Sequence, residues 1–147
     1  MNTYKININR TEVLNEVSEH SAYIGAKTSD YDRAAALEED EHFLSKLFDK
    51  CSSAFVGALK EFVSDSWKSE GDVFRFSVQL PDVFPSELSS ELTNLSYWCL
   101  VEMVLSEWLA VLSRADAAYY KNAADKRLFS LWELLHHKRR PRRERFR

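Results

Sequence analysis

The chain has 147 residues, the length of one ordinary domain, and 45% of them are hydrophobic, which predicts a packed core and argues against global disorder. Only three glycines and three prolines are present, which favours long helices over a sheet protein with many tight turns. The net charge of −3 conceals an asymmetry. Residues 138–147 hold seven basic residues and one acid, or +6, which leaves 13 basic and 22 acidic residues, or −9, for the rest. An acidic body with a basic tail suits head-to-tail contact between copies, or a tail that reaches toward an anionic partner.

The first predicted elements are a strand and a helix. Over residues 3–9, apolar and polar residues alternate with a period of two, which predicts a short strand with one buried face. Thr11 then has the position of a helix N-cap, and a first helix is predicted from there to about Gly25.

A second helix is predicted from about Asp32 to about Trp67, after a polar break. Its apolar residues recur at i, i+3 and i+4 spacing, which places them on one face of the helix. They are Leu44, Leu47, Phe48, Cys51, Phe55, Leu59 and Phe62. A turn around Gly71 follows. Both cysteines, Cys51 and Cys99, are expected as buried thiols, because a disulfide framework needs more cysteines and a secretory context.

The second half of the chain begins with the clearest strand, at residues 73–80, where phenylalanine, valine and leucine alternate with polar residues. Pro85 has the position of a helix start, where its missing N–H costs nothing. That helix continues into the apolar run Tyr97–Leu112, in which only a narrow polar stripe remains. We therefore expect it to be the central helix, with Leu105 and Leu109 in the core.

A last helix is predicted over about Asp116–His137, with Tyr120, Ala124, Leu128, Leu131 and Leu135 facing inward. No glycine or proline separates it from the preceding helix, so the two are either separate helices or one bent helix.

The predicted fold is mainly α: a bundle of about four helices with a minor two-strand β element and a basic C-terminal tail. Residues 1–137 form a single helical domain, with short strands near 3–9 and 73–80, and residues 138–147 form the tail. Two strands alone are marginal in water and expose their edges. Either they pair with each other over the helices, or they add to strands of a neighbouring copy.

We expect no membrane association. Residues 1–10 lack the apolar core that a signal peptide needs. The run Tyr97–Leu112 is too short to span a bilayer and is interrupted by Glu102, Ser106 and Glu107. The expected compartment is therefore the cytoplasm of the cell that makes the protein.

One pattern imitates a metal site. Two E-x-x-H pairs and two lone carboxylates follow the order of ligands in a di-iron four-helix bundle: Glu39 with His42, Glu133 with His136, and the single residues Glu16 and Glu102. At about 100° per residue, however, Glu39, His42 and Glu133 point away from the apolar stripes of their helices. A buried metal site needs inward ligands, so we predict no metal ligands here and expect Glu38–Glu41 to form a solvated acidic face.

No catalytic apparatus is predicted either, and no cofactor. The three glycines frame neither a strained nucleophile turn nor a phosphate-binding loop. The aromatic residues, including Trp67, Trp98, Trp108 and Trp132, are assigned mostly to the core. Tyr119 and Trp132 are expected in the core or at its edge, and the alternative, a position partly outside the apolar stripe, would suit them to a protein interface.

The basic tail is the strongest signal for function. Its candidate partner-binding residues are Lys138, Arg139, Arg140, Arg142, Arg143, Arg145 and Arg147. They suit either phosphate contact with nucleic acid or docking on an acidic protein surface, and a third interpretation is a terminus that only aids solubility. The acidic body argues against a general DNA-binding domain, because it repels phosphate everywhere outside the tail.

Several short segments between Phe74 and Arg143 resemble small uncharacterised helical proteins encoded in the structural gene blocks of tailed bacteriophages and prophages. The segments are Phe76–Pro81, the Leu-Ser-Glu-Trp-Leu sequence around Trp108, Ala118–Tyr120 and Arg140–Arg142. The resemblance implies a virion structural or assembly role, such as that of a connector-type protein between portal and tail. Such families are helical with a small β element and form rings. The resemblance brings no known site residues.

The leading hypothesis is therefore a phage virion structural or assembly protein, a head-tail connector-type ring component that acts through protein–protein contacts. Its partners would be further copies of itself and portal or tail components, with nucleic-acid contact by the tail as an option. It would be made in the host cytoplasm and reside in the virion. The alternative is a cytoplasmic helical adaptor or regulatory protein that binds nucleic acid or an acidic partner through its basic tail.

Overall fold

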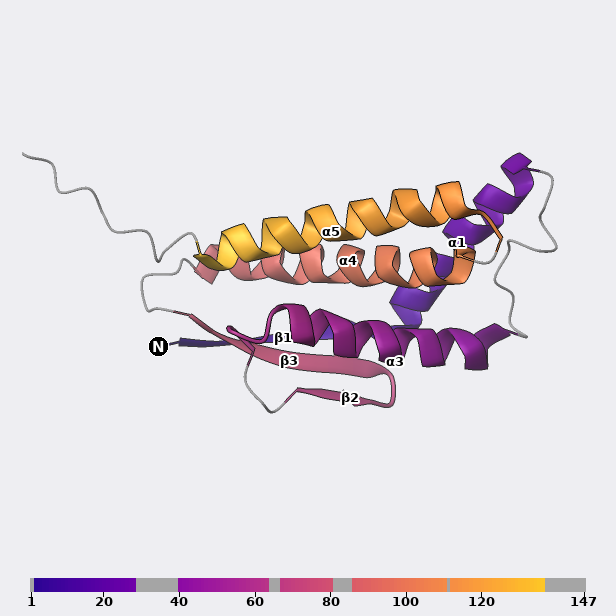
Figure 1. Ribbon diagram of the computed structural model, residues 1–147. Helices are drawn as coiled ribbons and strands as arrows, with labels where there is room; N and C mark the ends of the chain where they lie inside the picture. Colours follow the sequence, from indigo (N-terminus) through magenta and orange to yellow (C-terminus); the bar gives the residue numbers. More distant parts are fainter. Residues whose placement is uncertain (1, 29–39, 64–66, 81–85, 111, 137–147) are drawn as a thin grey trace, which may run out of the picture.

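The computed structural model describes residues 2–28, 40–63, 67–80, 86–110 and 112–136 (Figure 1). Within these ranges the elements run in the order β1 (Asn2–Asn9), α1 (Arg10–Thr28), α3 (Glu41–Ala58), β2 (Lys68–Glu70), β3 (Val73–Leu80), the short 3-10 helix η2 (Ser86–Leu88), α4 (Ser89–Leu109) and α5 (Arg114–His136). The prediction of a mainly α fold with four helices is confirmed. The predicted tail, residues 138–147, lies outside the described residues.

The two predicted strands pair with each other. β1 and β3 are antiparallel, from Asn2 opposite Leu80 to Asn9 opposite Val73, and β2 adds to the other edge of β3 to give the order β1-β3-β2. The prediction of two strands missed β2, because its three residues carry no apolar alternation. Gly71 forms the turn between β2 and β3 with a φ of 57°, a left-handed conformation that favours glycine.

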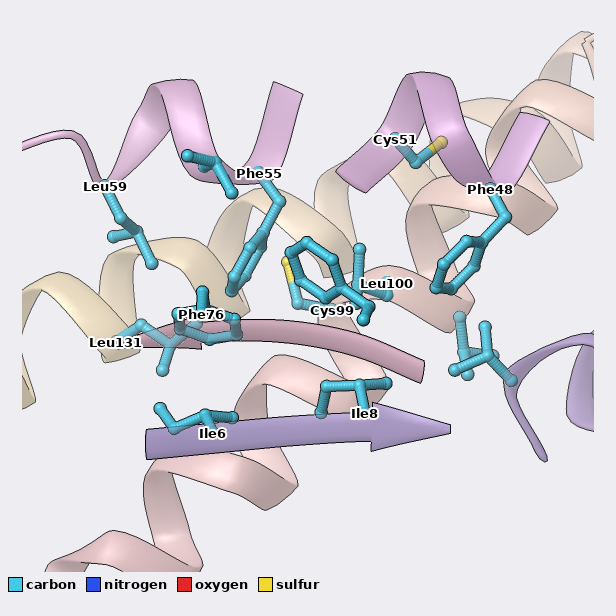
Figure 2. Close-up of a cluster of buried hydrophobic side chains, with 14 of the residues drawn as sticks. Ile6, Ile8, Phe48, Cys51, Phe55, Leu59, Phe76, Cys99, Leu100 and Leu131 are labelled. Atoms are coloured by element: carbon cyan, nitrogen blue, oxygen red, sulfur yellow. The ribbon is translucent and has the colours of Figure 1, made fainter. Parts of the chain in front are cut away.

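One apolar core joins the sheet to the helices. The buried face of the sheet packs against α3 and, through β1, also against α4, and α5 packs along α4 (Figure 1). Figure 2 shows side chains from all of these elements meeting in one cluster, among them Ile6, Ile8, Phe48, Phe55, Leu59, Phe76, Leu100 and Leu131. The ring of Phe55 contacts that of Phe76 edge to face at 5.4 Å, which is a preferred geometry for aromatic pairs. The apolar stripe predicted for α3 is thus the face that holds the sheet.

Helix α4 is the central helix, as predicted. It contacts α1, α3, α5 and β1, and Leu105 and Leu109 are fully buried. The chain then turns, and α5 packs along α4 as a separate helix rather than as its bent continuation. Ser113 marks the start of the new helix, because its hydroxyl oxygen accepts a hydrogen bond from the backbone N–H of Asp116 and caps it. In the described part of the chain, no helix has the length and apolar character required to cross a membrane.

Two predicted helix ends were wrong. The N-cap of α1 is Asn9 rather than Thr11: the Asn9 side-chain oxygen accepts from the backbone N–H of Glu12, and the Thr11 hydroxyl donates to Asp72 instead. α3 ends at Ala58 and does not reach Trp67. Beyond it the backbone carbonyl of Phe62 accepts from the N–H of Gln79, so this segment joins the sheet rather than continuing the helix. The predicted start of that helix, at about Asp32, lies outside the described residues.

Candidate protein interface

The candidate interface lies at the C-terminal end of α5, next to the predicted partner-binding tail. The seven basic residues of that tail, from Lys138 to Arg147, lie outside the described residues, so the structure does not place them. The described chain reaches His136, two residues before Lys138. The last turns of α5 are therefore the described surface nearest to the tail in the sequence, and this surface is the one to compare with the prediction.

A hollow of about 380 Å³ opens on the surface between the ends of α3 and α5. Its lining is almost wholly apolar and consists of Ala58, Leu59, Leu128, Phe129 and Trp132. Leu59 is buried and Leu128 half-buried, so these two residues connect the floor of the hollow to the core. An apolar hollow on the surface favours a partner that brings an apolar side chain to fill it.

The rim of the hollow carries two exposed aromatic side chains. Phe129 is 59% exposed and Trp132 45% exposed, and their rings stack with an interplanar angle of 13° and a centroid separation of 6.4 Å. Their exposure follows from the helix period: Leu131 and Leu135 take the buried face of α5, which turns positions 129 and 132 outward. A partner that covers these two side chains removes large apolar surface from water, which stabilises the complex.

His136 fixes the orientation of this aromatic pair. Its ring lies 3.8 Å from that of Trp132 between centroids, and its Nδ1 is 2.8 Å from the carbonyl oxygen of Trp132. On its other side the His136 ring meets Phe62, a buried residue, edge to face at 4.8 Å. A continuous row of rings thus runs from the core to the surface. Because packed rings lose little further freedom on binding, the surface is arranged for contact in advance.

The described residues of the metal-like pattern do not gather into one cluster. His42 and Glu133 are exposed, in agreement with the helix-period argument, and Glu39 lies outside the described residues. Glu16 pairs with His20 at 3.3 Å, and Glu102 pairs with Arg127 at 2.7 Å. No group of three or more metal-binding side chains occurs in the part of the chain that the structure describes.

The pair of Glu102 and Arg127 joins α4 to α5 inside the fold. Glu102 is 8% exposed, and the Arg127 guanidinium lies 5.8 Å from the centre of the Trp98 ring. The second carboxylate oxygen of Glu102, Oε2, is buried without a hydrogen-bond partner among the described residues. A buried carboxylate held in this way fixes how α4 and α5 pack, so we assign a structural role to the ion pair.

The two cysteines are free and buried, as predicted. Burial is the main cause that raises the pKa of Cys51, to about 12, with a smaller contribution from Glu107. Burial likewise raises the pKa of Cys99 far above the ordinary value of a thiol. Because the thiolate is the nucleophile, neither thiol is suited to covalent chemistry at neutral pH.

The sequence analysis placed Tyr119 and Trp132 in the core or at its edge, and it considered exposure at a protein interface only as the alternative. Trp132 and Tyr119 are exposed, at 45% and 68%, whereas Trp98 and Trp108 pack against the core. Phe129 was missed, although it lies three residues before Trp132 and hence on the same face of the helix. A search for apolar pairs on the polar face of α5 would have found it. The floor of the hollow was beyond such a search, because Ala58 and Leu59 come from α3 and the residue that follows it.

The comparisons with known proteins add no relative: no family model, no curated protein and no solved structure matches the chain.

Proposed function

We propose that the protein is a structural or assembly protein of a tailed-phage virion, a connector-type component that acts through protein–protein contacts. The observation that carries the proposal is the stacked pair of Phe129 and Trp132, exposed over an apolar hollow directly before a segment with a charge of +6. Aromatic residues in such hollows are typical of the energetically dominant centre of a protein interface.

The proposed partner surface is an acidic protein surface that also carries an apolar side chain. The hollow takes the apolar side chain, and the basic segment that follows His136 pairs with carboxylates around it. Nucleic acid fits less well. An exposed phenylalanine and tryptophan can stack on bases, but the net −9 of residues 1–137 repels a polyanion.

The assignment to a virion rests on the resemblance to phage structural proteins, and the uneven charge supports repeated contact between copies. A basic end and an acidic body are unlike surfaces, so copies joined through them form a head-to-tail chain. If the rotation from one copy to the next closes, the chain becomes a ring. In this proposal the ring then docks on portal or tail components.

The test is affinity capture of the full-length protein from infected or induced cells, after treatment with nuclease. We expect portal or tail proteins in the eluate. The double variant Phe129→Ser/Trp132→Ser should lose them, and Tyr119→Ser should retain them, because Tyr119 is an exposed aromatic of the same helix that does not line the hollow. An eluate that holds only host factors would instead support the alternative, a cytoplasmic adaptor or regulatory protein. An eluate that holds only nucleic acid when nuclease is omitted would also support this alternative.

A further inference from the structure

One face of α5 carries four side chains whose spacing is the same in both directions along the helix. Asp125, Phe129, Trp132 and His136 follow one another at i, i+4, i+7 and i+11, which places them in one stripe. We call these four residues the α5 stripe. It has an acid at one end, a base at the other end and two aromatic side chains between them. The stripe spans roughly 16 Å along the helix axis.

The two ends of the α5 stripe can each bind a charged group. Asp125 is exposed and forms no ion pair in the part of the chain that the structure describes. At the other end, Nδ1 of His136 lies 2.8 Å from the carbonyl oxygen of Trp132. Because a carbonyl only accepts hydrogen bonds, Nδ1 carries the hydrogen, and Nε2 is the nitrogen left for a partner. The protonated ring donates through Nε2 to a carboxylate.

An antiparallel second copy of α5 matches the α5 stripe from end to end. A two-fold rotation about the midpoint of the stripe puts Asp125 opposite His136 of the second copy, and Phe129 opposite its Trp132. The acid of each copy then meets the base of the other, and the four rings meet in the middle over the two hollows. An apolar centre with a polar rim is the usual arrangement of a protein interface. A parallel alignment would instead place acid against acid.

We propose that the free protein forms a two-fold symmetric dimer through the α5 stripe, in which the second copy covers the hollow and the stacked rings of Phe129 and Trp132. Such a contact uses the same surface of both copies, so it closes with two chains. It involves no residue beyond His136. The dimer contact is distinct from the head-to-tail contact of the proposed function, and the inference does not rest on that function. A partner that fills the hollow would have to displace the second copy.

The area of the contact sets its expected strength. Phe129 and Trp132 are 59% and 45% exposed, so the four rings of two copies can bury roughly 400 Å². A stable interface buries at least about 1,200 Å² in total. The remaining residues around the hollow add to the buried area, but the dimer should still be weak and reversible. We expect a dissociation constant on the order of 10 μM.

The first test measures the mass of the full-length protein by sedimentation equilibrium. We expect wild-type protein to pass from one chain to two chains of 17.1 kDa each as its concentration rises, and to grow no further. Phe129→Ser/Trp132→Ser should raise the dissociation constant at least about thirtyfold, the change typical of losing a dominant interface residue. Tyr119→Ser is the matched control, since it removes an exposed aromatic of α5 outside the stripe, and it should dimerise as the wild type does.

The second test exchanges charges across the two-fold axis. Asp125→Lys alone sets a lysine against His136 at both ends of the dimer, and His136→Glu alone sets a glutamate against Asp125. Each variant alone should dimerise at least about tenfold more weakly than the wild type. In an equimolar mixture, the new lysine of one chain faces the new glutamate of the other, while the native acid and base still meet at the other end.

Dimers should therefore appear in the mixture at a concentration at which each variant alone is monomeric. Their formation also shows that both variants are folded. Glu19→Lys is the control for the change of charge, because Glu19 is exposed on α1, at the end of the molecule opposite to the end of α5 (Figure 1). Mixed with His136→Glu, it should give no such gain.

Other results would overturn the inference. A wild-type protein that stays monomeric up to roughly a hundred times the expected dissociation constant has no such dimer. If Phe129→Ser/Trp132→Ser dimerises like the wild type, the copies contact each other elsewhere. Oligomers that grow steadily without stopping at two chains show an open head-to-tail contact, and the proposed function then stands while the inference falls. A charge-exchange mixture that remains monomeric, although both variants unfold cooperatively in urea, also contradicts the inference.

Discussion

Two groups of aromatic residues in this protein have similar chemistry and opposite surroundings. The inner group, Phe48, Phe55, Phe74 and Phe76, lies between α3 and the sheet, and its rings contact one another mostly edge to face. The outer group, Phe129 and Trp132, stacks at the surface of α5. The inner rings are held on all sides by the fold, whereas the outer rings expose a face that the fold does not cover. From this comparison we expect the first group to determine stability, and we propose that the second group contributes to binding.

The largest expected difference concerns Cys51, which lies beside the inner group. A rise in pKa from 9.0 to about 12 lowers the thiolate fraction at pH 8 by roughly a thousandfold, so the native thiol should react that much more slowly with a thiol reagent. Ser130→Cys on the exposed face of α5 provides the accessible control. Equal rates for Cys51 and the control would show that the inner region is open to solvent.

The same rise in the pKa of Cys51 makes the free energy of unfolding depend on pH. The folded-state pKa of Cys51 lies above its unfolded value, so the protonated thiol contributes stability that is fully present below about pH 9 and lost as the pH rises through about 12. Cys51→Ser should flatten the decline in unfolding free energy over that range. An unchanged slope would contradict the assignment of Cys51 to the buried core.

Substitution within the inner group should have a large effect on stability. Phe55 is fully buried and contacts both Phe74 and Phe76. Phe55→Ala should lower the free energy of unfolding by about 3–5 kcal/mol, from lost burial and the cavity left behind. Leu109→Ala, in the central helix, should lower it by about 2–5 kcal/mol. Urea unfolding measures both values. A loss below about 0.5 kcal/mol would show that the substituted residue does not belong to the core.

An intermediate effect is expected at the ion pair between α4 and α5. Arg127→Met leaves the buried carboxylate of Glu102 without its partner and should cost about 1–3 kcal/mol, reduced by the partial exposure of Arg127. Adding Glu102→Gln removes the unpaired charge and should restore part of the loss. If the double variant is as unstable as the sum of the single variants, the two side chains do not interact.

The outer group should contribute little to stability. Phe129→Ser and Trp132→Ser together should lower the free energy of unfolding by no more than about 1 kcal/mol, because each residue lies on an exposed helix surface. A loss comparable to that of Phe55→Ala would erase the difference between the two groups and identify the hollow as part of the core.

Removing the tail should affect stability even less. A chain that ends at His137 keeps every apolar stripe of the helices, so its thermal midpoint should stay close to that of the full chain, while assembly and partner binding should drop. Reversing Arg139, Arg140, Arg142 and Arg143 to Glu should weaken binding more than deletion, because repulsion is added to lost attraction. If the shortened chain binds and assembles as well as the full one, the tail only aids solubility.

Much of the fold follows from periodicity in the sequence. The period of two at residues 73–80 located β3 to the residue, and the i, i+3, i+4 stripe located the buried face of α3. Periodicity failed where tertiary contacts decide. The end of α3 depends on the backbone of Phe62 pairing with Gln79, and the cap of α1 depends on Asn9. Neither contact leaves a repeat in the sequence.

The candidate interface was predictable only in part, for a related reason. Charge counts identify residues 138–147, and the helix period leaves Trp132 at the edge of the apolar stripe. The hollow itself forms from residues at the end of α3 and in α5 that are about 70 positions apart in the chain.

The central claim, that the outer aromatic group is an interface, is tested most directly by acrylamide quenching of tryptophan fluorescence as the protein concentration is raised through the range in which oligomers form. Trp132 is the most exposed tryptophan of the described residues, so it should dominate the quenching in dilute solution. We predict that quenching falls as the copies associate and that a Trp132→Phe variant shows no such fall. Quenching that stays constant in the wild type while its mass rises would contradict the claim, because Trp132 would then remain exposed in the assembly.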